Sequence, residues 1–203
     1  MLRHGLQSGV ASERLDGRTG KAGTASKAAS QASALRSTSV DDRSIVEKQL
    51  GRPPRAFRRV AVRCPFGRPA VVEQAPFDEF GEPFPTMYWL TCRHLVAALA
   101  RIEADGGVER WSALAREDPE LEASVDRGHE EQRRLRPELP GGIGGQTRTG
   151  GLKCLHAHAA FALARPGYEL GERILAEVEP LWPSQECCTP DKEAIPALPV
   201  WPS

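Results

Sequence analysis

The strongest constraint on the fold of this chain is the order of its apolar patterns, with alternating segments first and helical periods later. Residues 58–64 alternate, with Val60 and Cys64 on one face, which predicts a half-buried strand. Further short strands are expected around residues 70–72 and 87–90, which are rich in β-branched or aromatic side chains. Because the strands come before the helices instead of alternating with them, the pattern favours an α+β fold over a wound parallel sheet.

The rest of the chain carries apolar side chains at helical spacing. A short helix is expected after Asp41 and Asp42, which are good N-cap residues, and Gly51 should end it. Later helices are predicted from Leu95 to Ile102, around Trp111 and Leu114, from Asp118 to Leu135, over residues 154–164 and over residues 172–178. We therefore predict a small antiparallel sheet of about three strands followed by four or five helices.

Composition indicates one folded domain between two tails. Residues 1–40 are dominated by small and polar residues and contain no aromatic side chain, which predicts a disordered tail. Residues 41–182 form the predicted α+β domain. Residues 183–203 are rich in proline and are expected to be a flexible tail, in which the pair Cys187–Cys188 has no assigned role.

Charge and hydropathy indicate a cytoplasmic protein. No apolar run approaches the roughly 18–20 residues that span a bilayer, and no apolar stretch of a secretory signal is present. Residues 1–72 carry 14 Lys and Arg against 5 Asp and Glu, whereas residues 73–203 carry 13 against 22. Opposite balances of +9 and −9 are compatible with self-association or with an anionic partner for the first part. The partner itself is unknown.

Three short segments combine cysteine with turns, helix starts and nearby histidines, and these segments suggest a functional site. Thiolate and imidazole are the usual ligands of zinc and other borderline metals. A tetrahedral site would take Cys64, Cys92, Cys154 and His158, because Cys154 and His158 are spaced i, i+4 on the predicted helix. Zinc or an iron–sulfur cluster with one non-cysteine ligand would suit these residues.

Two other interpretations of the cysteines stay open. In a thiol-dependent enzyme, Cys92 or Cys154 would be the nucleophile and His94 or His156 the base. Alternatively, the cysteines are small buried side chains that only pack.

A glycine-rich segment from Gly141 to Gly151 precedes the predicted helix at residue 154. Main-chain N–H groups of such a loop bind anions. The candidate anion-binding residues are Gly142, Gly144, Gly145, Arg148 and Lys153. The spacing is not that of a P-loop or of a dinucleotide fingerprint, and a mobile connector is the alternative.

Residues 51–72 contain six arginines and no acid. Such a segment could contact phosphate groups, and a non-catalytic adaptor linked to cell division or nucleic acid is a further hypothesis. No recognised reading module accompanies the charge, so nucleic acid is an unlikely partner.

Residues of about 45–180 resemble an uncharacterised actinobacterial family, the domain-of-unknown-function family 501. The motifs that carry the resemblance are Arg63-Cys64-Pro65-Phe66-Gly67-Arg68-Pro69, Phe84-Pro85-Thr86, Leu90-Thr91-Cys92, Gly141-Gly142-Ile143-Gly144-Gly145 and Lys153-Cys154-Leu155-His156-Ala157-His158. In that family a proline usually follows the second cysteine, where this chain has Arg93. The resemblance implies no catalytic residue. Members often carry the label "septum formation initiator", apparently from gene neighbourhood, and the lack of sustained heptads here does not support it.

Overall fold

A computed structural model of the chain describes residues 42–147 and 151–188. The described residues belong to one compact unit that covers residues 38–203. The predicted disordered tail of residues 1–40 lies outside the described residues, as does the end of the predicted C-terminal tail from residue 189 onward.

Three antiparallel strands form one sheet, in the order β1-β2-β3. The strands are β1 (Phe57–Arg63), β2 (Pro69–Gln74) and β3 (Tyr88–Leu90). Strand β2 is buried along its whole length because it lies between the other two. The turn from β1 to β2 is the one expected from Cys64-Pro65-Phe66-Gly67, since the Gly67 N–H donates to the Cys64 carbonyl at 2.9 Å and Gly67 has φ +75°.

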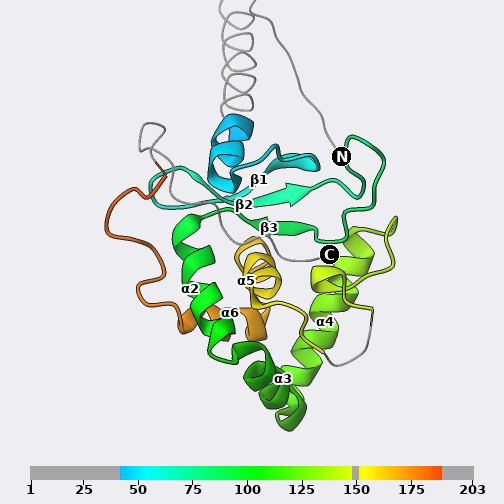
Figure 1. Cartoon of the computed structure of the whole chain (residues 1–203). Helices are drawn as coiled ribbons and strands as arrows, with labels where there is room; N and C mark the ends of the chain where they lie inside the picture. Colours follow the sequence, from blue (N-terminus) through cyan, green and yellow to red (C-terminus); the bar gives the residue numbers. More distant parts are fainter. Residues whose placement is uncertain (1–41, 148–150, 189–203) are drawn as a thin grey trace, which may run out of the picture. The chain divides into compact units, whose positions relative to one another are not determined.

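Helices follow the sheet in the chain and cover one of its faces (Figure 1), which confirms the predicted α+β fold. Residues 42–50 form the short first helix on the other side of the sheet, as the capping pattern predicted. The later helices are α2 (Arg93–Ala104), α3 (Gly107–Glu117), α4 (Pro119–Leu135), the short 3-10 helix η1 (Ile143–Gly145), α5 (Leu155–Ala164) and α6 (Glu169–Ala176).

Helix α5 is the centre of the core. It contacts the sheet, α2 and α6, and seven of its ten residues are buried. A helix that is apolar on every side has to be enclosed on every side. The Phe161 ring is fully buried and packs edge-on against the rings of Tyr88 and Tyr168. Gly171 lets α6 pack closely against α5, because a Cβ at this position would lie only 2.6 Å from the Ala162 Cβ.

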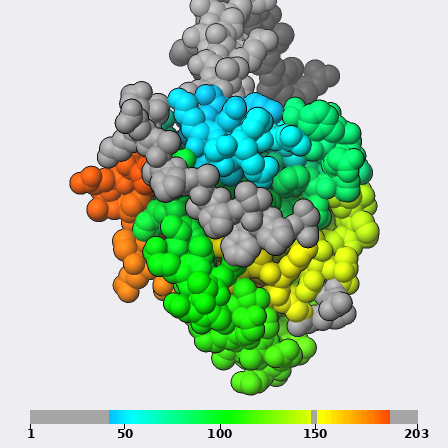
Figure 2. Space-filling model, viewed as in Figure 1, coloured from blue at the N-terminus to red at the C-terminus, as the bar shows by residue number. Residues whose placement is uncertain are grey.

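The described part of the C-terminal segment packs against the core. Leu181 and Trp182, at the end of the predicted domain, and Cys187, beyond its expected boundary at residue 182, all contact the core. Figure 2 shows this orange segment at the surface beside the green residues of α2. The packed part of the described chain therefore extends to Cys187.

Replacing Phe161 by alanine tests whether α5 is the centre of the core. We expect Phe161→Ala to lower the free energy of unfolding by about 3–5 kcal/mol, because it removes a fully buried ring and leaves a cavity. Leu114→Ala on α3 is the matched control, since Leu114 is 39% exposed, and it should cost less than about 1 kcal/mol. Urea denaturation of both variants gives the comparison. Equal losses would contradict the central role of α5.

Candidate functional site

The start of α5 is where chemically reactive side chains gather. Cys154 is the N-cap residue of α5 and has an extended backbone, φ −163° and ψ 127°. Its own side chain does not cap the helix. Instead, the Glu103 carboxylate of α2 accepts the Leu155 N–H at 2.6 Å. A carboxylate is favourable there because the first N–H groups of a helix lack partners and carry partial positive charge.

Glu103, Cys154 and His156 form a three-residue cluster, which we call the α5 cluster. Their ligand atoms all lie within 4.8 Å of one another. The His156 Nδ1 lies 3.1 Å from Glu103 Oε1 and 3.7 Å from Cys154 Sγ. The side chains of Glu103 and His156 are 10% and 17% exposed, so solvent reaches the cluster.

The second ring nitrogen of His156 has a partner of its own. His156 Nε2 lies 3.1 Å from the main-chain carbonyl of Val96, so Nε2 donates a hydrogen to that oxygen. Burial alone would lower the pKa of His156, but hydrogen bonds to Cys154 and Glu103 outweigh it and raise the pKa to about 10. Without a metal, the ring is therefore a cation that is paired with the Glu103 carboxylate, whose pKa is held below its usual value although burial would raise it.

Glu103 is the member of the cluster that sequence reasoning missed. Attention to cysteine and histidine alone could not find it. One signal was present: Glu103 comes seven residues after Val96 and four after Leu99, which places an acid beside the apolar stripe of α2. A charged residue next to a buried stripe needs a partner, and here the partners come from α5.

The four predicted metal ligands lie in different environments. The predicted set was Cys64, Cys92, Cys154 and His158. Among the described residues, Cys154 belongs to a group of three potential metal ligands, the α5 cluster. Cys64 is half-buried in the β1–β2 turn, and Cys92 is buried at the N-cap of α2. The i, i+4 argument for Cys154 and His158 does not apply, because Cys154 precedes the helix and has an extended backbone.

His158 lies inside the core. Its side chain is fully buried, and Nδ1 lies 2.6 Å from the Tyr168 hydroxyl. Burial, followed by the proximity of His129, lowers the pKa of His158 to about 3. His158 is therefore a neutral core residue in this structure and not a residue that faces the α5 cluster. Histidines on buried helices are often packed in this way.

The remaining candidate base, His94, is engaged with the C-terminal segment. Its Nε2 lies 2.7 Å from the Pro180 carbonyl oxygen.

In its described residues, 141–147 and 151, the glycine loop does not present the open row of N–H groups that an anion site needs. The N–H groups of Gly142 and Gly145 donate to the carbonyls of Gln146 and Gly142, and Ile143 N–H donates to His129 Nδ1 at 2.9 Å. A Cβ at Gly142 would overlap the His129 ring, so close packing accounts for this glycine. Lys153 is exposed, and Arg148 lies outside the described residues. The anion-loop interpretation stays a prediction without structural support.

Each of the six arginines of residues 51–72 has a partner within the protein. Arg58 and Arg59 pair with Glu73, Arg63 pairs with Asp42, and Arg68 pairs with Glu186. Arg52 and Arg55 lie over the rings of Trp89 and Phe80. The basic segment therefore serves the packing of the sheet and its neighbours.

Comparisons with known proteins give a family similarity over part of the chain and no activity. Residues 60–141 match the family model described as "Protein of unknown function (DUF501)". No curated protein matches the chain. No solved structure matches it either. Within residues 42–147 and 151–188, no helix has the length and apolar character that a membrane crossing requires.

The matched segment contains the motifs around Cys64 and Cys92, whereas the motif around Cys154 lies beyond it. The match does not bear on the actinobacterial origin, which stays a prediction, or on the septum label. Over residues 60–141, the chain is thus similar to the DUF501 family of unknown function, as its motifs indicated.

Proposed function

We propose that the protein binds one zinc ion through Glu103, Cys154 and His156. The observation that carries the proposal is the convergence of a carboxylate, a thiol and an imidazole nitrogen within 4.8 Å. These are the three kinds of protein group that bind zinc. They come from α2 and from the start of α5, so a bound ion would join two helices of the core.

The distances within the cluster suit a tetrahedral ion. Bond lengths of about 2.1 Å to nitrogen or oxygen and about 2.3 Å to sulfur place tetrahedral ligands roughly 3.4–3.6 Å apart. The observed separations from His156 Nδ1 are 3.1 Å to Glu103 Oε1 and 3.7 Å to Cys154 Sγ. Small side-chain rotations therefore suffice to enclose an ion.

The surroundings of His156 support the same assignment. A histidine that binds a metal through one ring nitrogen usually donates its other N–H to a carbonyl or a carboxylate. The contact between His156 Nε2 and the Val96 carbonyl has this form and leaves Nδ1 facing the cluster. Zinc would replace the proton on Nδ1, and the charges of thiolate and carboxylate would balance the ion.

The same geometry favours zinc over an iron–sulfur cluster. Iron–sulfur clusters are held mainly by cysteine thiolates, and the α5 cluster offers one. Three protein ligands leave a fourth position for water, an arrangement found in catalytic zinc sites. The reaction, if there is one, is not indicated by these residues.

Metal titration of the chelator-treated full chain tests the proposal. We expect wild-type protein to bind one zinc per chain and to give the visible absorption of tetrahedral thiolate coordination with Co²⁺. Cys154→Ser and Glu103→Gln should each weaken zinc binding by at least about tenfold, because each removes a direct ligand.

Cys64→Ser and Cys92→Ser are the matched controls, and both should bind zinc as the wild type does. Equal losses in these controls and in Cys154→Ser would favour the original set of Cys64, Cys92, Cys154 and His158. Failure of the wild-type protein to bind zinc or cobalt would overturn both sets.

A second candidate function uses the same residues without a metal. The contact of 3.7 Å between Cys154 Sγ and His156 Nδ1 suits a thiol enzyme in which Cys154 is the nucleophile. In that case Cys154 should be alkylated by iodoacetamide faster than Cys64 in metal-free protein, and His156→Gln should remove the difference. Mass spectrometry of the alkylated peptides measures both rates. Equal rates in the wild type would exclude an activated thiol.

The charged pair of Glu103 and His156 predicts how the stability of metal-free protein depends on pH. The pKa of His156 is raised from 6.5 to about 10, so its stabilising effect is complete below pH 6.5 and is lost as pH rises toward 10. Wild-type protein should therefore be more stable than His156→Gln near pH 6, by on the order of a few kcal/mol, and this advantage should shrink by pH 10. Urea denaturation at each pH measures the difference. An advantage that grows with pH would contradict the assigned charge state.

We also propose a cytoplasmic location. The five cysteines are all free thiols in the structure, and thiols persist in reducing compartments.

A further inference from the structure

Three thiols gather at the start of α2, away from the residues of the α5 cluster. Cys187 Sγ lies 3.4 Å from Cys188 Sγ, and the Cys187 thiol also lies near enough to that of Cys92 to interact with it. Successive side chains of an extended segment point in opposite directions, so the convergence of Cys187 and Cys188 requires a bent backbone. We call Cys92, Cys187 and Cys188 the thiol cluster.

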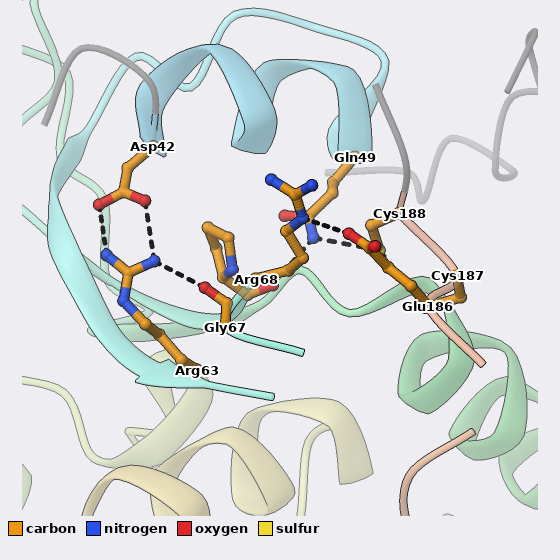
Figure 3. Close-up of polar contacts among 9 residues, drawn as sticks. Asp42, Gln49, Arg63, Gly67, Arg68, Glu186, Cys187 and Cys188 are labelled. Atoms are coloured by element: carbon orange, nitrogen blue, oxygen red, sulfur yellow. Dashed lines mark hydrogen bonds and ion pairs between the residues drawn. The ribbon is translucent and has the colours of Figure 1, made fainter. Parts of the chain in front are cut away.

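Polar contacts fix the segment that brings Cys187 and Cys188 to α2. Figure 3 shows Glu186 paired with Arg68 and the Gln49 side chain reaching Cys188, with an Nε2 to Sγ distance of 3.3 Å. Earlier in the same segment, the Pro180 carbonyl oxygen lies 2.7 Å from His94 Nε2. Contacts to the first helix, to the turn before β2 and to α2 hold the thiols together.

The three thiols differ in their exposure and freedom. Cys92 is 2% exposed, whereas Cys187 and Cys188 are half-buried. Cys188 is held by Gln49, and Cys187 interacts with both other thiols. A small reagent can therefore reach the half-buried Cys187 from solvent, whereas Cys92 is nearly closed to it.

We propose that the thiol cluster is a thiol–disulfide exchange site in which a small-molecule disulfide oxidises Cys187 and Cys92 resolves the product. In the first step the Cys187 sulfur, after losing its proton, attacks one sulfur of the reagent and releases one thiolate. In the second step the Cys92 sulfur attacks Cys187 and releases the second thiol. The protein loses two electrons and two protons, and the reagent is reduced to two thiols.

Cys92 is a better resolving residue than Cys188. Adjacent residues have Cα atoms about 3.8 Å apart across a trans peptide, which is below the usual range of about 4.4–6.8 Å for a disulfide. A Cys187–Cys188 disulfide would therefore be strained and easily reduced. A Cys92–Cys187 disulfide instead connects the start of α2 to the C-terminal segment and closes a long loop of the chain, which stabilises the folded state.

Disulfide mapping on the full chain tests this proposal. Reduced protein is incubated with oxidised glutathione, alkylated and digested with trypsin without reduction. Cys92 falls in peptide 64–93 and the other two cysteines fall in peptide 174–192, so the expected product joins these two peptides and has Cys188 alkylated. A Cys187–Cys188 bond would instead lower the mass of peptide 174–192 alone by two hydrogens.

Single-cysteine variants identify the sulfurs. Cys187→Ser should reduce the joined peptides by at least about tenfold, whereas Cys64→Ser and Cys188→Ser should form them as the wild type does. Cys92→Ala should stop at a mixed disulfide with glutathione on Cys187. If Cys92→Ala does not fold by circular dichroism, the Cys64→Ser and Cys188→Ser variants still decide the assignment. Glutathione adducts alone, a bond within peptide 174–192, or loss of the joined peptides in Cys64→Ser would each overturn the proposal.

Discussion

The burial of α5 on every side is the constraint on which the rest of this structure depends. Half of its ten residues are alanine, and the helix is enclosed by the sheet, α2 and α6. Small side chains let these neighbours approach closely, as Gly171 does from α6. The first N–H groups of a helix have no partner within the helix, and at the largely buried start of α5 the protein supplies an acceptor.

The Glu103 carboxylate is that acceptor, and the α5 cluster follows from it. A carboxylate brought to a half-buried helix start needs a positive partner, which His156 supplies from the first turn of α5. Cys154 lies beside them because it is the N-cap residue. The same requirement that closes the core thus assembles a thiol, an imidazole and a carboxylate.

Ion pairs of residues in and beside the sheet also join separate segments of the chain. Glu73 is buried in β2 and is paired with Arg58 and Arg59 of β1. The pair Arg63–Asp42 attaches the first helix to β1, and Arg68–Glu186 attaches the C-terminal segment. The arginines of a segment that could contact phosphate groups pair, in the folded protein, with acids and aromatic rings of the same chain. The C-terminal segment in turn brings Cys187 and Cys188 to Cys92.

Local pattern was sufficient for the fold class and for most elements. Alternation identified β1, the Asp118–Pro119 pair identified the start of α4, and Asp118 indeed accepts N–H groups of that helix. These features depend on residues that are neighbours in the chain. The double glycine Gly106–Gly107 likewise marked the end of α2, and Gly106 adopts φ +79° there.

The sequence by itself determined an α+β protein with reactive cysteines at strand ends and helix starts, because spacing and capping are local properties. Which side chains meet was decided only by the tertiary structure. His158 turned into the core while His156 turned toward Glu103, and this outcome depends on the rotation of α5 against α2. The docking of the C-terminal segment depends on contacts between residues more than a hundred positions apart, such as Arg68 with Glu186. No local pattern encodes such pairings, since each residue of the pair is an ordinary surface charge until the fold brings its partner.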